Sequence, residues 1–401
     1  MTIRVTKPEF NLREKLSELD KPTGLKGLEL MRSENTQDVR DIVHADRKNI
    51  IINGSMEVSQ RATTKTGITA NGFYTCDRWH LQLNGPTVSL AQDSDNPGHG
   101  FNKSLALTVT TAVGSIAAGN SLKLRYLIEG YDVARLQYGT KYAKPFTLSF
   151  WVKSSLTGQF AISFTRDSRI INRQVTVHAA NIWEHKSITI LGDYDTALGN
   201  TTDGTGMILQ MFPSSGANST DGANIPVWNS FHNAHTAYGA NMGHLTTTNS
   251  TFKITGVQME IGTQHTDFEF RRFKEELELC QRYFAIYPGR SGGIPFWQGY
   301  MGASYGYCSI PIPNFNMRAV PTPTDATTGT SSSTGNLYDA GGVNIKGNFA
   351  GNGTVTLSCG GYAPSGLGLI MNFGNHQSGD KDGVVASWNG ASPGIFLDAE
   401  L

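Results

Sequence analysis

The sequence predicts a mainly β protein: a β-sandwich of the jelly-roll type, preceded by a helical segment and followed by a small β-domain. Three observations indicate this fold class. At least ten short segments alternate between apolar and polar residues, and Gly, Asn or Asp turns separate them. Glycine accounts for 45 of the 401 residues, while charged residues make up only 16%. The density of charge also changes twice along the chain, as is typical at domain boundaries.

Residues 1–48 have a helical pattern and hold ten basic and nine acidic residues. Five apolar residues recur on one helical face of this segment: Leu28, Met31, Val39, Ile42 and Val43. A narrow apolar stripe with charges on the other faces is typical of a helix that docks on another chain. We therefore expect attachment or oligomerisation through this stripe. The alternative is a solvated helix that packs on its own β-domain.

Residues 49–268 are predicted to form the sandwich. The segment IIINGSMEVS indicates a strand, an Asn-Gly turn and a second strand. Further strands are predicted at 78–83, 87–92, 103–110, 120–129, 146–154, 159–166, 173–179, 185–191, 206–212 and 251–261. In FTLSFWVKS the residues Phe146, Leu148, Phe150 and Val152 share one face. Trp151 falls on the opposite face, as a packing residue or as a platform for a ligand.

A helical connector is predicted at 269–284, and a C-terminal β-domain at 285–401. The latter range holds only ten charges but 22 glycines. Its candidate ligand-binding residues are aromatic: Trp297, Tyr300, Tyr305, Tyr307 and Trp388. Rings spaced by small residues can bind the apolar faces of neutral sugars, so these residues are candidates for receptor or glycan binding. Alternatively, they pack around the axis of an oligomer. Trp228 lies in a similar loop-like context.

Composition argues against several classes of protein. The 33 basic and 33 acidic residues cancel, whereas a nucleic-acid-binding protein needs a surplus of positive charge. No apolar run approaches the 18 residues of a membrane span, and the first ten residues lack the apolar core of a secretory signal peptide. The four cysteines are far apart and form no C-x-x-C pair, which argues against zinc sites and a disulfide framework.

Neither a metal site nor a cofactor is expected. His232 and His235, with His244 further on, have roughly the spacing of metal ligands, but they lie in a loop-like stretch. A turn-rich segment with three aspartates could hold a structural calcium or form simple turns: Asp193, Asp195 and Asp203.

No catalytic motif is evident. The sequence has no nucleophile elbow, no phosphate-binding loop and no recognisable pair of carboxylates for glycoside cleavage. We therefore expect a protein that is not an enzyme.

The order of several phrases resembles that of bacteriophage tail-fibre and related virion fibre proteins. These phrases are KNIIINGSMEVSQR, YTCDRWHLQL, FTLSFWVKSS, FKITGVQMEIG, FEFRRFKEELELCQRYF and IPIPNFNMRAVPTPT. The phrase GLKGLELMRSE is similar to virion proteins of short-tailed phages of marine bacteria. Together these phrases extend over most of the chain.

The resemblance implies a structural virion protein made in the host cytoplasm. It implies a short homotrimeric tail fibre with a sandwich similar to carbohydrate-binding modules. Residues 1–48 would attach to a tail adaptor, a nozzle or the capsid, and the C-terminal domain would recognise a glycan or protein of the host surface. Two alternatives are a capsid-decorating or adaptor fibre with a mainly structural role, and a polysaccharide-degrading tailspike. No nucleic acid or membrane insertion is expected.

Overall fold

The computed structural model describes residues 48–288, 317–318 and 399–401, together with the backbone of nine strands between 295 and 398. The five predicted attachment residues at 28–43 lie outside the described residues. Among the residues described, no helix has the length and apolar character needed to cross a membrane.

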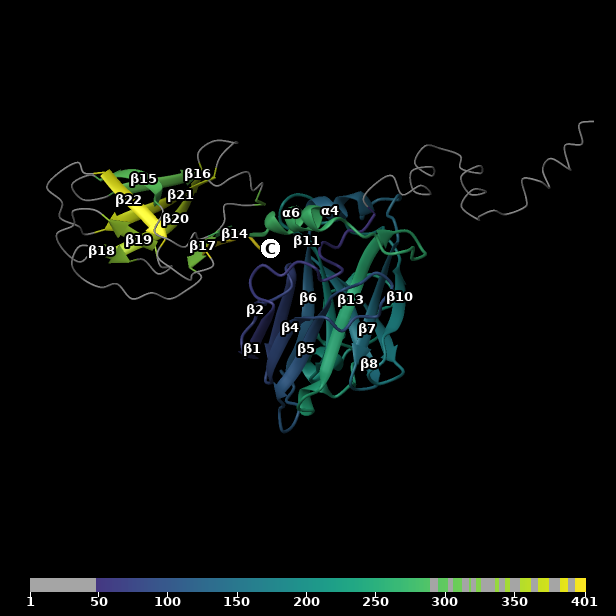
Figure 1. The fold of residues 1–401 in the computed structure, drawn as a ribbon. Helices are drawn as coiled ribbons and strands as arrows, with labels where there is room; N and C mark the ends of the chain where they lie inside the picture. Colours follow the sequence, from purple (N-terminus) through teal and green to yellow (C-terminus); the bar gives the residue numbers. More distant parts are fainter. Residues whose placement is uncertain are drawn as a thin grey trace, which may run out of the picture. The chain divides into compact units, whose positions relative to one another are not determined.

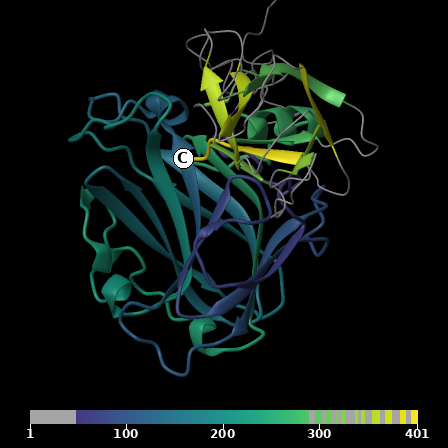
Figure 2. The same cartoon turned by 90° about the vertical axis from the view of Figure 1, so that its left-hand side faces the viewer.

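Two antiparallel sheets form a sandwich of the jelly-roll type, which confirms the predicted fold class (Figures 1 and 2). The six-stranded sheet has the order β1 (Thr64–Ile68), β4 (Thr87–Asp93), β5 (Ser104–Thr111), β13 (Thr251–Ile261), β7 (Phe146–Ser154) and β10 (Glu184–Ile190). The seven-stranded sheet has the order β12 (Asn229–Ser230), β9 (Arg169–Val177), β8 (Gly158–Arg166), β11 (Thr205–Ser215), β6 (Ser121–Glu129), β3 (Trp79–Asn84) and β2 (Gly72–Phe73).

The hydrophobic core lies between the two sheets, where inward residues of both sheets interdigitate. Phe146 of β7 contacts Phe164 of β8 edge to face, with 4.8 Å between the ring centroids. Phe160 of β8 meets Phe252 of β13 in the same way at 5.2 Å. Each of these rings is at most 1% exposed, and loss of a buried Phe side chain typically costs about 3–5 kcal/mol. These contacts across the two layers fix one sheet against the other.

Period-two alternation located the sandwich strands well. All ten strands predicted between 78 and 261 are present, and those at 146–154 and 251–261 have the predicted bounds.

The predicted strand–turn–strand at 50–59 is wrong, because this segment forms turns and irregular backbone. Ile50, Ile51 and Ile52 are all buried, so they present no solvent-facing side of a strand. Asn53 closes the turn by donating to the carbonyl oxygens of Val58 at 2.8 Å and Asp77 at 3.0 Å.

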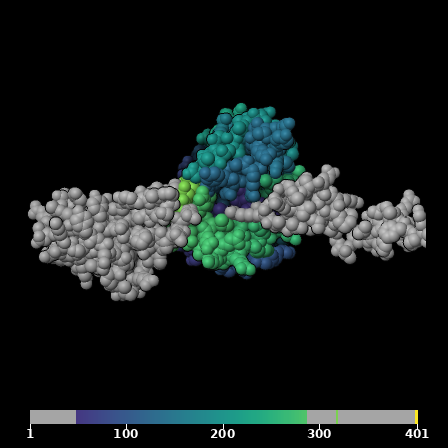
Figure 3. Space-filling view, turned by 90° about the horizontal axis from the view of Figure 1, so that it is seen from above, coloured from purple at the N-terminus to yellow at the C-terminus, as the bar shows by residue number. Residues whose placement is uncertain are grey.

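Two helices lie at the same end of the sandwich: α4 (Gly130–Val133) and α6 (Phe273–Gln281) (Figure 1). The guanidinium of Arg282, just after α6, binds the buried carboxylate of Glu129, just before α4. Cys280 and Tyr283 belong to the same buried cluster as the sandwich core. Seen from above, the green segment that includes α6 forms one side of this end of the sandwich, and blue and teal segments form the other side (Figure 3).

The chain leaves the sandwich through β14 (Phe284–Pro288) and returns through β23 (Gly394–Asp398), which pair antiparallel. The carboxylate of Glu400 binds Arg78, a guanidinium that is only 1% exposed. The ring of Tyr283 lies 3.4 Å from the Arg78 guanidinium carbon and covers it. Residues 398–400 are thus tied to the sandwich, although most of the C-terminal part precedes them in sequence.

Within the described residues of the C-terminal part, the strands form two sheets. A three-stranded sheet has the order β14, β23 and β17 (Thr322–Asp325). A second sheet has the order β18 (Asn336–Tyr338), β19 (Val343–Lys346), β22 (Gly383–Trp388), β15 (Pro295–Met301), β16 (Gly306–Pro311), β21 (Leu367–Gly374) and β20 (Thr354–Gly361).

Candidate functional site

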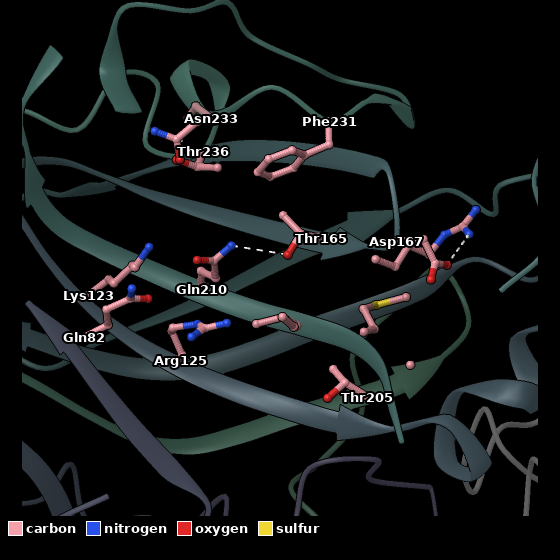
Figure 4. A pocket seen from close by; sticks show the side chains of 14 residues that line it. Gln82, Lys123, Arg125, Thr165, Asp167, Thr205, Gln210, Phe231, Asn233 and Thr236 are labelled. Carbon is pink, nitrogen blue, oxygen red and sulfur yellow. Dashed lines mark hydrogen bonds and ion pairs between the residues drawn. The ribbon is translucent and has the colours of Figure 1, made fainter. Parts of the chain in front are cut away.

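A pocket of about 460 Å³ lies on the face of the seven-stranded sheet that points away from the core (Figure 4). Its floor is formed by outward side chains of β3, β6, β11 and β8, and one wall comes from the loop that follows β12. Four polar floor residues group together in Figure 4: Gln82, Lys123, Arg125 and Gln210. Phe231, Asn233 and Thr236 of the wall stand above them.

Strand register creates a row of polar residues across five neighbouring strands. Each residue of the row is paired with the next: His80, Arg125, Gln210, Ser163 and Asn172. Apart from Arg173, their sequence neighbours belong to the hydrophobic core. A polar row on an outer sheet face is ordinary when it is solvated, but here Gln210, Ser163 and Asn172 are at most 6% exposed. Of this row, Arg125 and Gln210 line the pocket.

Several polar atoms of this row are buried without a hydrogen-bonding partner among the described residues. They are Arg125 Nε, His80 Nδ1 and Ser163 Oγ. Gln210 makes one long contact, in which its Nε2 donates to Thr165 Oγ1 at 3.3 Å. A buried donor without an acceptor costs roughly 1–3 kcal/mol, and Arg78 Nε and Arg166 Nε are unpartnered in the same way.

The floor is also positively charged without a matching acid. No ion pair of Lys123 or Arg125 with a carboxylate occurs in the described part of the chain, and the Lys123 ammonium lies 4.8 Å from the centroid of Phe212. Burial, with Arg125 close by, lowers the pKa of Lys123 to about 8, and burial also lowers that of Arg125. Burial together with these two cations lowers the pKa of His80 to about 4, so His80 is neutral at pH 7.

The wall of the pocket presents one exposed aromatic ring. Phe231 is 45% exposed, and its backbone amide donates to the carbonyl oxygen of Ser168 at 2.6 Å, which fixes its position. Next to it Asn233 Nδ2 donates to the carbonyl oxygen of Asn218 at 2.8 Å. An apolar ring face beside a polar floor matches the two faces of a sugar, which are apolar C–H groups and hydroxyls.

Asn172 holds the loop of the wall against the sheet. Its amide nitrogen donates to the carbonyl oxygens of Ala223 at 2.9 Å and His235 at 2.7 Å, and its oxygen accepts the amide of Ile225 at 2.9 Å. Glycine is required at 222, because a Cβ atom there would lie 2.2 Å from His235 Nδ1. The loop is therefore fixed by buried hydrogen bonds, so Phe231 is preorganised.

A second hollow lies on the outer face of the six-stranded sheet and contains Trp151. The ring of His99 stacks on Trp151, with 4.9 Å between centroids and 20° between the ring planes, and His185 contacts Trp151 at 5.1 Å. Trp151 thus packs against neighbouring rings, whereas the first pocket has unpartnered polar atoms. We therefore take the pocket above Lys123 and Arg125 as the candidate site.

The aromatic residues proposed for binding in the C-terminal part lie outside the residues whose side chains the structure describes. Tyr305 is outside the described residues altogether. For the others the backbone pairing is known: Tyr300 pairs with Tyr307, Trp297 with Ala386, and Trp388 with Val343.

Trp228 is a structural residue and not an open platform. It is 7% exposed, its Nε1 donates to the carbonyl oxygen of Leu191 at 2.9 Å, and its ring meets Tyr138 at 5.7 Å. The nearby Asp193 is 2% exposed and binds the guanidinium groups of Arg166 and Arg169. The packing of Trp228 and the ion pairs of Asp193 both result from burial of this end of the sandwich. An aspartate whose charge is neutralised by two arginines is a poor calcium ligand.

The three histidines with metal-like spacing do not meet at one point. The rings of His232 and His235 lie 5.2 Å apart, and His235 Nδ1 accepts the amide of Ala223 at 2.8 Å. His244 is fully buried elsewhere, against Phe252. Within the described residues no group of histidines, cysteines and acids could hold a metal ion.

Sequence reasoning missed the pocket residues, although part of the signal was visible. In SLKLRYLIE the two cations alternate with leucines, so Lys123 and Arg125 had to share one face. Their neighbours Gln82 and Gln210 come from strands far away in sequence. Only the pairing of β6 with β3 and β11 brings these four residues together.

No family model and no curated protein sequence matches the chain. Solved structures that are similar include the enzymatically active domain of tailspike protein 4 of bacteriophage CBA120, at 14% identity and a TM-score of 0.30. That match covers 53% of this chain and 21% of the tailspike chain, so this chain spans about a fifth of the tailspike's length. A family 61 carbohydrate-binding module in complex with β-1,4-galactotriose is 9% identical, with a TM-score of 0.26 and coverage of 54% and 100%. A family 11 carbohydrate-binding module of a Clostridium thermocellum cellulosomal cellulase is 13% identical, with a TM-score of 0.26 and coverage of 50% of this chain and 96% of that chain.

Proposed function

We propose that the sandwich is a glycan-binding module of a bacteriophage virion fibre, and that its pocket contacts a polysaccharide of the host surface. The observation that carries this proposal is the group of polar side chains on the pocket floor, Gln82, Lys123, Arg125 and Gln210, beside the exposed ring of Phe231. Sugar recognition combines stacking on an apolar face with several hydrogen bonds to hydroxyl groups. The pocket offers both kinds of contact.

Binding without cleavage is part of the proposal. Glycoside hydrolysis needs two carboxylates that face each other across the substrate. Of the residues that line the pocket, only Asp167 is acidic, and its carboxylate accepts the amide of Gly199 at 2.7 Å. The acids Glu129, Glu184 and Glu260 of the sandwich are occupied elsewhere by hydrogen bonds.

The finer parts of the proposal rest on the resemblance of the sequence phrases to virion fibre proteins. We propose a homotrimer, located in the virion, that is attached by residues 1–48 and contributes to adsorption. The C-terminal domain would be a second recognition surface on the same fibre. Three copies of the pocket would raise the avidity for a repeating polysaccharide without any new contact.

The experiment is a binding assay of the full-length protein on an array of polysaccharides from bacterial surfaces. We expect binding that weakens at least tenfold in Phe231→Ala, because the variant loses the stacking ring. Phe273→Ala is a matched control, since Phe273 is a 59% exposed ring on α6 that does not line the pocket. Absence of binding to every polysaccharide would contradict the proposal and favour a purely structural or capsid-decorating fibre. Shortening of a bound polysaccharide would favour a tailspike enzyme.

A further inference from the structure

We infer that the pocket selects an acidic glycan, in which carboxylate or sulfate groups on the sugar rings bind Arg125 and Lys123. This inference deepens the proposed function and rests on it. It goes beyond glycan binding because it names the chemical class of the ligand and the two residues that distinguish an acidic sugar from a neutral one.

The floor of the pocket has an excess of positive charge. Two cations lie two residues apart on β6 and point to the same side of the sheet. The acidic residue that lines the pocket, Asp167, has its carboxylate oxygen 3.8 Å from Arg166 and accepts the amide of Gly199. Asp167 therefore does not neutralise the charges at the other end of the floor, where Figure 4 places Lys123 and Arg125.

Two other cations of the sandwich are buried more deeply than Lys123 and Arg125. Arg78 binds the carboxylate of Glu400, and Arg166 binds that of Asp193. The fold therefore supplies carboxylates to these two guanidinium groups, whereas the partly buried Arg173 donates to backbone carbonyl oxygens. Lys123 and Arg125 have no such acid within the described residues, and an anionic ligand would supply it.

Arg125 Nε is buried and unpartnered, and its cross-strand neighbours are His80 and Gln210. A carboxylate or sulfate oxygen could accept from this guanidinium, while Gln210 and Gln82 remain for the neutral hydroxyls of the sugar. Charge-assisted hydrogen bonds are roughly twice as strong as neutral ones, and partial burial reduces their screening by salt. The arrangement therefore favours an acidic over a neutral ring.

The test uses the full-length protein and an array of acidic polysaccharides, each beside its carboxyl-reduced or desulfated counterpart. Pairs of this kind differ in charge but not in linkage. We expect at least tenfold tighter binding to the acidic member of a pair, and a loss of this preference in Arg125→Gln and Lys123→Met. The matched control is Lys65→Met, which removes the same charge from an exposed position on β1 in the other sheet.

The outcomes separate the two proposals. Equal binding to both members of every pair would overturn the acidic selectivity and leave the glycan-binding function standing. Binding to none of the polysaccharides would overturn the proposed function itself. A preference for acidic members that survives in both pocket variants, or disappears equally in Lys65→Met, would show that general charge and not this pocket is responsible. Carboxylate-bearing and sulfated pairs also show which anion the pocket prefers.

Discussion

Replacement of Lys123 by Met should make the protein more stable while it weakens glycan binding. The lowered pKa of Lys123 means that the folded protein holds this proton less tightly than the unfolded chain does. Below pH 8 the charged ammonium therefore opposes folding, and this cost disappears as the pH rises from about 8 to 10.5. The shift corresponds to an upper limit of about 3 kcal/mol.

Two corrections reduce that limit. Solvent at the mouth of the pocket screens part of the charge, and the contact with the Phe212 ring stabilises the ammonium by about 0.5–1 kcal/mol. Methionine keeps the length of the side chain and can contact the same ring. We therefore expect a gain of about 1–2 kcal/mol at pH 7, or a rise of about 2–8 °C in the melting temperature.

The assay is thermal and urea unfolding of the wild type, Lys123→Met and Lys65→Met between pH 7 and pH 10. The wild type should gain stability above pH 8, whereas Lys123→Met should be more stable at pH 7 and change less with pH. Lys65→Met should behave like the wild type, because Lys65 is exposed. A Lys123→Met variant with an unchanged or lower melting temperature at pH 7 would refute the idea that an uncompensated charge is held in the pocket.

Three further predictions concern single residues. Burial lowers the pKa of His244 to about 4, so the wild type should lose up to about 3 kcal/mol of stability as the pH falls from 6.5 to 4, and His244→Gln should flatten this dependence in urea unfolding. Glu400→Gln leaves the buried Arg78 without a counter-charge and should cost about 3 kcal/mol in the same assay, whereas an unchanged stability would show that Arg78 needs no carboxylate. Phe231→Ala should change the melting temperature by less than about 2 °C, because its ring is largely exposed, and a larger fall would make Phe231 a packing residue.

The sandwich could be predicted from the sequence because inward residues such as Phe146 and Phe150 recur at every second position of their strands. Alternation fixes which face of a strand is buried, but it contains no information on which strand lies next to it. The polar row from His80 to Asn172 depends on such pairings, so the pocket could not be located. The segment at 50–59 misled for a different reason: its apolar run is buried as a turn, held by the side chain of Asn53.

Burial is also not encoded in the identity of a tryptophan in a loop-like sequence context. The sequence does not show whether a tryptophan is exposed or buried. Trp228 lies in a loop-like context, but its ring packs against Tyr138. Polar residues on strands are a weaker signal for a binding site than aromatic residues in loops, because most polar strand residues face solvent. The cross-strand partners of Lys123 and Arg125 are not acidic. The sequence of β6 alone does not reveal these partners.

The pairing of β14 with β23 has a consequence for the order in which the protein is built. All strands of the sandwich leave the ribosome before residue 262, but Glu400 follows only after the entire intervening part has been synthesised. Until then the guanidinium of Arg78 lies among the rings of Tyr126 and Tyr283 without its carboxylate. The sandwich therefore acquires the ion pair of Arg78 only after residues 398–400 have been synthesised.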